Sequence, residues 1–219
     1  MISDLAAGPA AIDRLYASSS APLPFDRSLH IRAFLLVRER GNLLIYSAPT
    51  LDADAPAIEA LGGVSRQYLG HRHEAAFASV WRPAPVFVHE RERDAVSKNL
   101  RVRGSFSRRH LLDQDFEVIP TPGHTAGATS FLWDTAEHRL LFTADTIHLR
   151  DGEWHAAVLG DSDRGRYLES LDLIRGLDFD VLVPWAASAG QPCCAHTTAS
   201  ETRRRIDALI DRVWRGGSG

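Results

Sequence analysis

The amino-acid sequence predicts an α+β fold in which stacked β-sheets are covered by helices. Short apolar runs rich in strand-forming residues recur along most of the chain, and amphipathic helical patterns lie before and between them. Their order does not follow the regular alternation that builds a parallel βαβ array. At 219 residues, 44% hydrophobic and 24% charged, the chain has the size and composition of one large domain. We expect that domain to span residues 1–215, with residues 216–219 as a disordered tail or a cloning remnant.

The strands are predicted from runs of aliphatic, β-branched and aromatic residues bounded by turn formers. Residues 30–37 and 42–47 are separated by Glu39-Arg40-Gly41, which predicts a β-hairpin. Further short strands are expected over residues 66–69, 85–88, 115–119, 129–133, 139–143 and 181–184.

Three helices are predicted from composition and from the spacing of apolar residues. The first covers residues 54–61. The second begins after a capping Asp163 and places Tyr167, Leu168, Leu171 and Ile174 on one face. The third covers residues 199–214, and its apolar stripe consists of Ile206, Leu209, Ile210, Val213 and Trp214.

Charge and hydropathy exclude several kinds of partner. The formal net charge of −3 offers no clustered basic excess for nucleic-acid phosphates, and no stretch has the apolar length of a membrane span. The first residues lack the pattern of a secretory signal, and the two cysteines, Cys193 and Cys194, are adjacent, where a disulfide between them would be strained. We therefore expect a cytoplasmic protein with reduced thiols. Its expected partner is a small-molecule substrate or ligand. The oligomeric state is left open.

Potential metal ligands follow several predicted strands directly. His71 and His73 come after residues 66–69, His124 lies in Thr121-Pro122-Gly123-His124-Thr125 after the strand at 115–119, and Asp145 follows the strand at 139–143. Loops at one edge of a sheet can bring such groups together, and imidazoles with a carboxylate suit zinc and similar divalent ions. Each residue also has a structural interpretation, as an exposed strand-end histidine, a turn-stabilising histidine or a loop-capping aspartate.

The order HxH, TPGHTxG and (G/A)D resembles the metallo-β-lactamase superfamily, and its glyoxalase II-like hydrolases in particular. The resemblance extends from about residue 30 to about residue 190, and TPGHTAGA at 121–128 is its most specific part. It implies a four-layer αββα sandwich with the active site at one edge of two sheets. It also implies that His71, His73 and His124 bind a first metal ion and that Asp145 bridges two ions.

The sequence departs from the family at the second metal subsite. The family motif HxHxDH has an aspartate and a histidine where this chain has Ala75 and Ala76, and a later PGH-like turn is replaced by Pro184-Trp185-Ala186. A DTG-like turn of the family is replaced by Tyr46-Ser47-Ala48. The first subsite keeps three imidazoles and one carboxylate, whereas the second keeps only Asp145. The resemblance therefore implies half of a two-metal site.

Several residues near this site have two interpretations. Glu74 is either solvated or a replacement ligand or catalytic base, and Trp185 either fills the vacant subsite or contacts substrate. Cys193, Cys194 or His196 can return a ligand to the vacant subsite, although the cysteines are more simply explained as small buried hydrophobes. The remaining histidines are assigned structural roles: His30, His89, His110, His138, His148 and His155.

The function expected from these features is that of a mono-metal hydrolase. One divalent ion, zinc by preference, would activate a bound water against an ester, a thioester or a similar small substrate, with Asp145 and Glu74 as candidate catalytic residues. Two alternatives stand beside it. One is a catalytically silent member that binds a metal or a ligand, and the other is an interaction protein that keeps only the fold and binds no metal.

Overall fold

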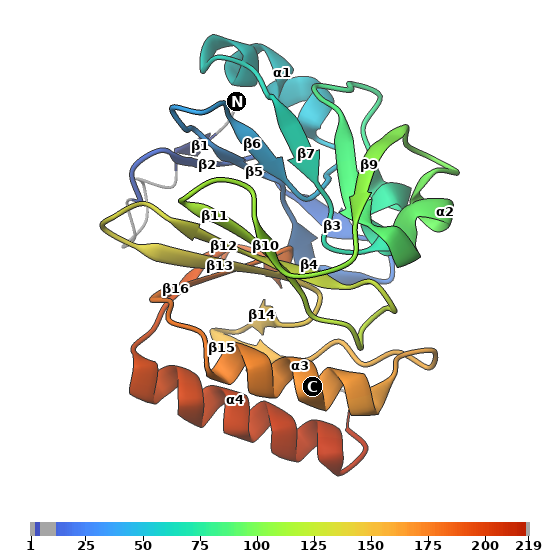
Figure 1. Cartoon of the computed structure of the whole chain (residues 1–219), viewed down its shortest axis with the longest axis vertical. Coiled ribbons are helices and arrows are strands. Elements are labelled where there is room, and N and C mark those ends of the chain that lie inside the picture. Colours follow the sequence, from blue (N-terminus) through green and yellow to red (C-terminus); the bar gives the residue numbers. More distant parts are fainter. Residues whose placement is uncertain (1–2, 5–11, 218–219) are drawn as a thin grey trace. The chain divides into compact units, whose positions relative to one another are not determined.

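The computed structural model describes residues 3–4 and 12–217, and the short apolar runs of the sequence pair there into sheets (Figure 1). The chain divides after Phe106 into two compact units. Each unit contains its own sheet, helices and apolar core.

The first unit is built on a sheet that contains seven strands among its described residues, in the order β1-β2-β5-β6-β7-β8-β9. Their bounds are Ser3–Asp4, Leu15–Ala17, Phe34–Leu36, Leu43–Ile45, Arg66–Tyr68, Val86–His89 and Val102–Phe106. The predicted hairpin is confirmed by the antiparallel pair β5 and β6, whereas β6, β7, β8 and β9 run parallel. The carboxyl ends of these parallel strands, including the residues just before His71, therefore lie at one edge of the sheet.

Helices cover this sheet where its strands are apolar. The helices are α1 (Leu51–Ala60), the 3₁₀ helices η2 (Arg72–Phe77) and η3 (Glu90–Glu92), and α2 (Arg93–Val96). Leu51 and Ile58 of α1 pack against Leu35 and Leu44 of the sheet. A further pair, β3 (Ala21–Leu23) and β4 (Asp26–Ile31), runs antiparallel. The predicted strand at 30–37 is therefore two strands, β4 and β5.

The second unit is built on a sheet of six strands, in the order β10-β11-β12-β13-β16-β18. Their bounds are His110–Leu111, Phe116–Pro120, Thr129–Asp134, Arg139–Ala144, Val181–Pro184 and Ala195–His196. β13 and β16 run parallel, so Asp145 and Trp185 both follow carboxyl ends of neighbouring strands. Three more strands, β14 (His148–Arg150), β15 (Glu153–His155) and β17 (Ala186–Ser188), pair in the order β15-β14-β17.

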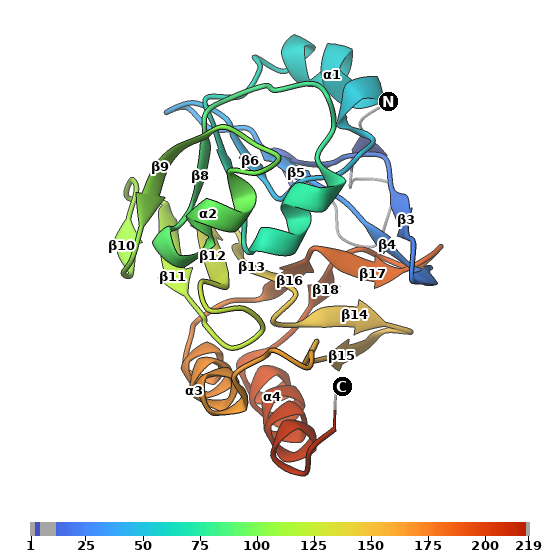
Figure 2. The ribbon, with the colours of Figure 1, turned by 90° about the vertical axis from the view of Figure 1, so that its right-hand side faces the viewer.

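Two helices, α3 (Arg164–Arg175) and α4 (Ala199–Trp214), lie side by side in this unit (Figure 2). They share an apolar core with the six-stranded sheet, in which Leu171 of α3 and Leu209 of α4 pack with Leu141 of β13. The predicted cap is confirmed, because the Asp163 side chain accepts a hydrogen bond from the Arg166 N–H. Fully burying one such leucine contributes roughly 1.5–3 kcal/mol.

The prediction that Trp214 belongs to the apolar stripe of α4 is wrong. Ile206, Leu209 and Val213 are buried, but the Trp214 side chain is 78% exposed. Successive residues of a helix are separated by about 100°, so Trp214 lies about 80° from Ile206 and beyond the edge of the apolar stripe.

Two further expectations concern the tail at residues 216–219 and the absence of a membrane span. Of the predicted tail, residues 218–219 lie outside the described residues, whereas the Gly216 and Gly217 carbonyls accept hydrogen bonds from Arg164. In residues 12–217, every helix is too short or too polar to cross a membrane.

Candidate metal centre

The first unit presents two imidazoles just after strand β7. The chain leaves β7 at Tyr68, and His71 and His73 follow at the start of the 3₁₀ helix η2. Their rings lie 5.1 Å apart between centroids and nearly perpendicular, at 88°. His71 is buried and His73 is half-buried.

The Glu74 side chain orients the ring of His71. Its Oε1 lies 3.0 Å from His71 Nδ1 and accepts hydrogen bonds from the Gly70 and His71 N–H groups at 2.8 and 3.1 Å. Because a carboxylate only accepts, Nδ1 carries the ring proton and Nε2 has the lone pair that a metal requires. The side chain of Glu74 is 0% exposed. The expectation that it is solvated is therefore wrong, because the turn folds the carboxylate back onto its own amides.

A second buried carboxylate fixes the same turn from outside it. Glu92 of η3 accepts a hydrogen bond of 2.9 Å from the Arg72 N–H and lies 3.8 Å from the Arg72 guanidinium. Two carboxylates 18 positions apart in sequence thus hold the backbone on which both imidazoles are mounted.

Ala75 and Ala76, at the positions where the resemblance implies an aspartate and a histidine, have different surroundings. Ala75 packs into an apolar cluster with Leu69, Val88 and Val96, while Ala76 is exposed. Position 75 therefore contributes to the core of the first unit in this chain.

The second unit presents His124 from the turn that follows β11. Its Nδ1 lies 2.6 Å from the Ala157 carbonyl oxygen, which can only accept, so Nδ1 again carries the proton and Nε2 has the lone pair. Gly123 allows this turn to pack on α3, since a Cβ there would lie 2.4 Å from the Tyr167 Cα. The Gly123 φ of +143° also disfavours other residues.

Asp145 approaches His124 from the end of β13. The chain turns there through Ala144, whose φ of +48° is unusual for a residue with a side chain. The turn is held by the Thr143 hydroxyl, which donates to the Ile147 carbonyl. Asp145 Oδ2 lies 3.6 Å from His124 Nε2, and the carboxylate is 17% exposed, so solvent or a ligand can reach it.

The Tyr167 hydroxyl, on helix α3, connects the backbone at Asp145 with the backbone at Ala157, whose carbonyl contacts His124. Tyr167 donates to the Thr146 carbonyl at 2.6 Å, lies 3.2 Å from the Asp145 carbonyl, and accepts from the Ala157 N–H at 3.0 Å. Burial raises the pKa of this phenol, which keeps it protonated. The sequence predicts Tyr167 only as an apolar residue of a helix face, because nothing local marks it as a partner of residues 145 and 157.

Two further histidines lie near this part of the second unit. The rings of His148 and His155, on the paired strands β14 and β15, have centroids 5.6 Å apart. Burial lowers the pKa of His148 to about 4; the Asp145 carboxylate opposes this shift and His155 adds to it. His148 is therefore a neutral imidazole at neutral pH.

The three candidate replacement ligands, Cys193, Cys194 and His196, lie in strand β18 or directly before it. His196 lies in β18 and pairs with Val181 at the amino end of β16, whereas Trp185 follows the carboxyl end. Cys193 packs against the apolar core of the second unit, and Cys194 is buried. A hydrogen bond to Cys193 and burial raise the pKa of Cys194, which disfavours the thiolate that a metal would bind. The position of His196 within the second unit contradicts the interpretation that it returns a ligand to the vacant subsite. The burial of the cysteines favours the interpretation that they are small buried hydrophobic residues.

The Trp185 side chain is 2% exposed, which agrees with the interpretation that it fills the vacant subsite. Its backbone N–H donates to the Ala144 carbonyl at 3.4 Å, so it lies beside the turn that carries Asp145. Its contact with a substrate stays a prediction.

The chemistry of these donors fits a metal ion. His71, His73, His124 and Asp145 are the candidate metal-binding residues, and in each unit one imidazole has Nδ1 engaged by an acceptor. This second contact is the usual way in which proteins fix the orientation and tautomer of a metal-binding histidine. Three imidazoles and a carboxylate are a ligand set that zinc accepts.

Comparison with known proteins identifies the class to which this fold and these residues belong. The sequence model of the metallo-β-lactamase superfamily matches residues 30–186, and the chain belongs to that superfamily. The predicted α+β sandwich of the metallo-β-lactamase type is thereby confirmed. A comparison with curated proteins found no match.

Solved structures of the superfamily have the same fold. A metallo-β-lactamase from Pontibacter korlensis superposes with a TM-score of 0.69 at 15% identity, covering 92% of this chain and 97% of that one. The metallo-β-lactamase GOB-18 from Elizabethkingia meningoseptica gives 0.61 at 15% identity, with 92% and 88% covered. A metallo-β-lactamase family protein from Thermus thermophilus gives 0.60 at 16% identity, with 94% and 81% covered. At these identities the similarity establishes the fold alone.

Proposed function

We propose that the protein is a mono-metal hydrolase that acts on an ester, a thioester or a similar small substrate. The metal ion, zinc by preference, is held by His71, His73, His124 and Asp145. The observation that carries this proposal is the engagement of two imidazoles through Nδ1, His71 by Glu74 and His124 by Ala157. Each unit thus prepares Nε2 donors of the kind that the superfamily uses.

When bound, a zinc ion supplies Lewis acidity and lowers the pKa of a water ligand to about 7. The residues of the chain do the rest. The partly exposed Asp145 carboxylate can orient a water molecule or accept its proton, while Tyr167 and the Ala157 carbonyl keep Asp145 and His124 in register. Glu74 holds His71, and in this proposal it acts as a positioning residue.

The proposed hydrolase is slow. Ala75, Ala76 and Trp185 replace the residues that in the superfamily hold a second ion and orient the attacking water. Loss of an oriented base or of an oxyanion stabiliser typically lowers the rate by about 10²-fold or more each. The alternative, a catalytically silent metal-binding protein, is favoured by the same three replacements.

Turnover of activated substrates tests the proposal. Zinc-loaded protein should hydrolyse p-nitrophenyl acetate or an aryl thioester above background, and a chelator should abolish the activity reversibly. His124→Ala should remove the activity, whereas His110→Ala, on the edge strand β10, should retain it as a matched control. Zinc-bound protein without turnover would support the silent alternative, and equal turnover by His124→Ala would contradict this site.

A further inference from the structure

A second group of metal-ligand side chains lies at the opposite ends of the strands that lead to Asp145 and Trp185. His138 directly precedes β13, Asp180 directly precedes β16, and His196 ends β18. One ligand atom from each of these residues lies within 4.8 Å of the others. All three residues belong to the second unit, so the cluster is formed within one compact body.

Strand pairing fixes the positions of these residues. The Asp180 N–H donates a hydrogen bond to the Arg139 carbonyl. The Asp180 carbonyl in turn accepts a hydrogen bond from the Thr197 N–H. His196 lies opposite Val181 in the antiparallel pair β16 and β18. The three donors are thus mounted on three neighbouring strands of one sheet.

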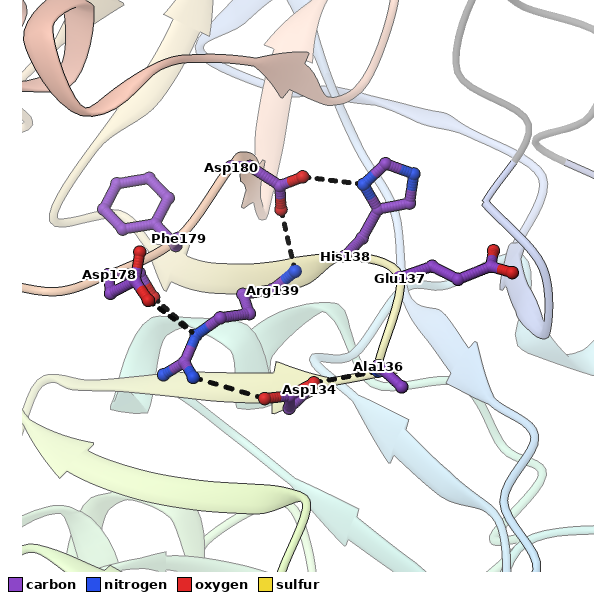
Figure 3. A pocket seen from close by; sticks show the side chains of 8 residues that line it. All are labelled: Asp134, Ala136, Glu137, His138, Arg139, Asp178, Phe179 and Asp180. Atoms are coloured by element: carbon purple, nitrogen blue, oxygen red, sulfur yellow. Dashed lines mark hydrogen bonds and ion pairs between the residues drawn. The ribbon is translucent and has the colours of Figure 1, made fainter.

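The side chains already contact one another. His138 Nδ1 lies 2.7 Å from Asp180 Oδ2, and the His138 and His196 rings have centroids 5.4 Å apart. The other Asp180 oxygen accepts from the Arg139 N–H at 2.7 Å, which fixes the carboxylate (Figure 3). The His138 and Asp180 side chains are 31% and 43% exposed, so an ion can enter from solvent.

The charge around the cluster favours a cation. Asp134, Glu137 and Asp178 line the same surface pocket, together with His138 and Asp180 (Figure 3). The Arg139 guanidinium is turned away from His138, toward Asp134 and Asp178. The residues that line the pocket thus include four carboxylates and one guanidinium.

We propose that His138, Asp180 and His196 form a binding site for one zinc ion or a similar divalent transition-metal ion, separate from the candidate metal centre. Two imidazoles and a carboxylate are ligands that such ions prefer, and water can complete the coordination. Zinc ligands at 2.0–2.1 Å in a tetrahedron lie roughly 3.3 Å apart. Small rotations of half-exposed side chains bring atoms that are now within 4.8 Å to that separation.

The site links the beginnings of β13 and β16 to the end of β18. A metal ion that binds only the folded state raises the free energy of unfolding. At ion concentrations above the Kd, this increase grows with the logarithm of the ratio of the ion concentration to the Kd. Two of these strands, β13 and β16, position Asp145 and Trp185 at their other ends, so the ion would hold together the strands of this sheet that carry them. Without metal, side-chain contacts already join the beginnings of β13 and β16, among them those of His138 with Asp180 and of Arg139 with Asp178.

Zinc titration in the absence of the candidate metal centre tests the proposal. In the full chain carrying His71→Ala and His124→Ala, calorimetry should detect close to one zinc ion per chain, and zinc should raise the melting temperature. Adding His196→Ala or Asp180→Asn should weaken zinc binding at least about 10-fold. His196→Ala leaves the His138–Asp180 contact in place, so this variant should fold even if a change at His138 does not.

Adding His110→Ala to the same background is the matched control, because β10 is at the other edge of this sheet, and zinc binding should be unchanged. Loss of zinc binding in the background variant, or unchanged affinity after His196→Ala and Asp180→Asn, would overturn the proposal and leave the cluster as a hydrogen-bonded link only. Because the background lacks two proposed ligands of the candidate metal centre, this result is independent of the proposed hydrolase.

Discussion

Glu74 and the Ala157 carbonyl perform the same task on two imidazoles, since each accepts at Nδ1 and leaves Nε2 as a donor. Glu74 differs in being ionisable, so it also contributes negative charge behind His71. We expect Glu74→Gln to weaken zinc binding about 10- to 100-fold, the usual effect of losing such a support. Turnover at saturating zinc should change little if Glu74 positions His71, and should fall about 10²-fold or more if it is the base.

Glu92→Gln is the matched control for this change. Glu92 is buried to a similar degree and holds the same turn, but it does so through the Arg72 N–H in place of an imidazole ring. Its substitution should lower the free energy of unfolding while zinc affinity stays within about threefold of the original, less than the loss of a ligand's own support. Equal loss of zinc affinity in both variants would show that the turn as a whole, and not the carboxylate on His71, governs the site.

His148 predicts a dependence of stability on pH. Its pKa is about 4 in the folded protein against an ordinary 6.5, so the unfolded chain binds the proton more readily. Stability is therefore complete above about pH 6.5 and is lost as the pH falls toward 4, at up to about 1.4 kcal/mol per pH unit. Denaturant unfolding at pH 7 and pH 5 should differ by about 2 kcal/mol more in the wild type than in His148→Gln, and equal differences would contradict the buried neutral imidazole.

The turn at 121–125 depends on its close approach to α3. In Gly123→Ala the new Cβ would meet the Tyr167 backbone at 2.4 Å, which forces the helix and the His124 turn apart. Gly152→Ala is the matched control, because Gly152 also has a positive φ but no atom within 4 Å of its Cβ position. Gly123→Ala should cost about 1–3 kcal/mol more than Gly152→Ala, measured by denaturant unfolding. Similar costs would show that helix α3 yields without strain.

The elements were predictable where the sequence is strongly patterned. The helix α3 with its Asp163 cap, the helix α4, and the strands β11, β12 and β13 follow from apolar spacing and turn residues. The hairpin of β14 and β15 was missed, although Asp151-Gly152 is a strong hairpin signal, because the flanking strands have only three residues each. The division of residues 30–37 into β4 and β5 depends on pairing with different partners, which local sequence does not encode.

Across the molecule, the ligand-type residues could be predicted and their supports could not. His71, His73, His124 and Asp145 stand in the motifs through which the sequence resembles the superfamily, whose sequence model matches this region. Tyr167 supports residues about 20 positions earlier in the chain, and Ala157 contributes only a carbonyl, so neither carries a local sequence signal. Glu74 stands at a variable position of the HxHxDH motif, so its role in orienting His71 follows only from its burial and its contact with the His71 ring.

The central claim is that the chain retains one of the superfamily's two metal subsites. Zinc stoichiometry tests it most directly, and it is best measured in the variant carrying His138→Ala and His196→Ala, where the second cluster cannot contribute. After reconstitution and dialysis, elemental analysis should find close to one zinc ion per chain, and adding His124→Ala should reduce it well below one. Two ions per chain in the variant with the intact centre, or none, would contradict the claim.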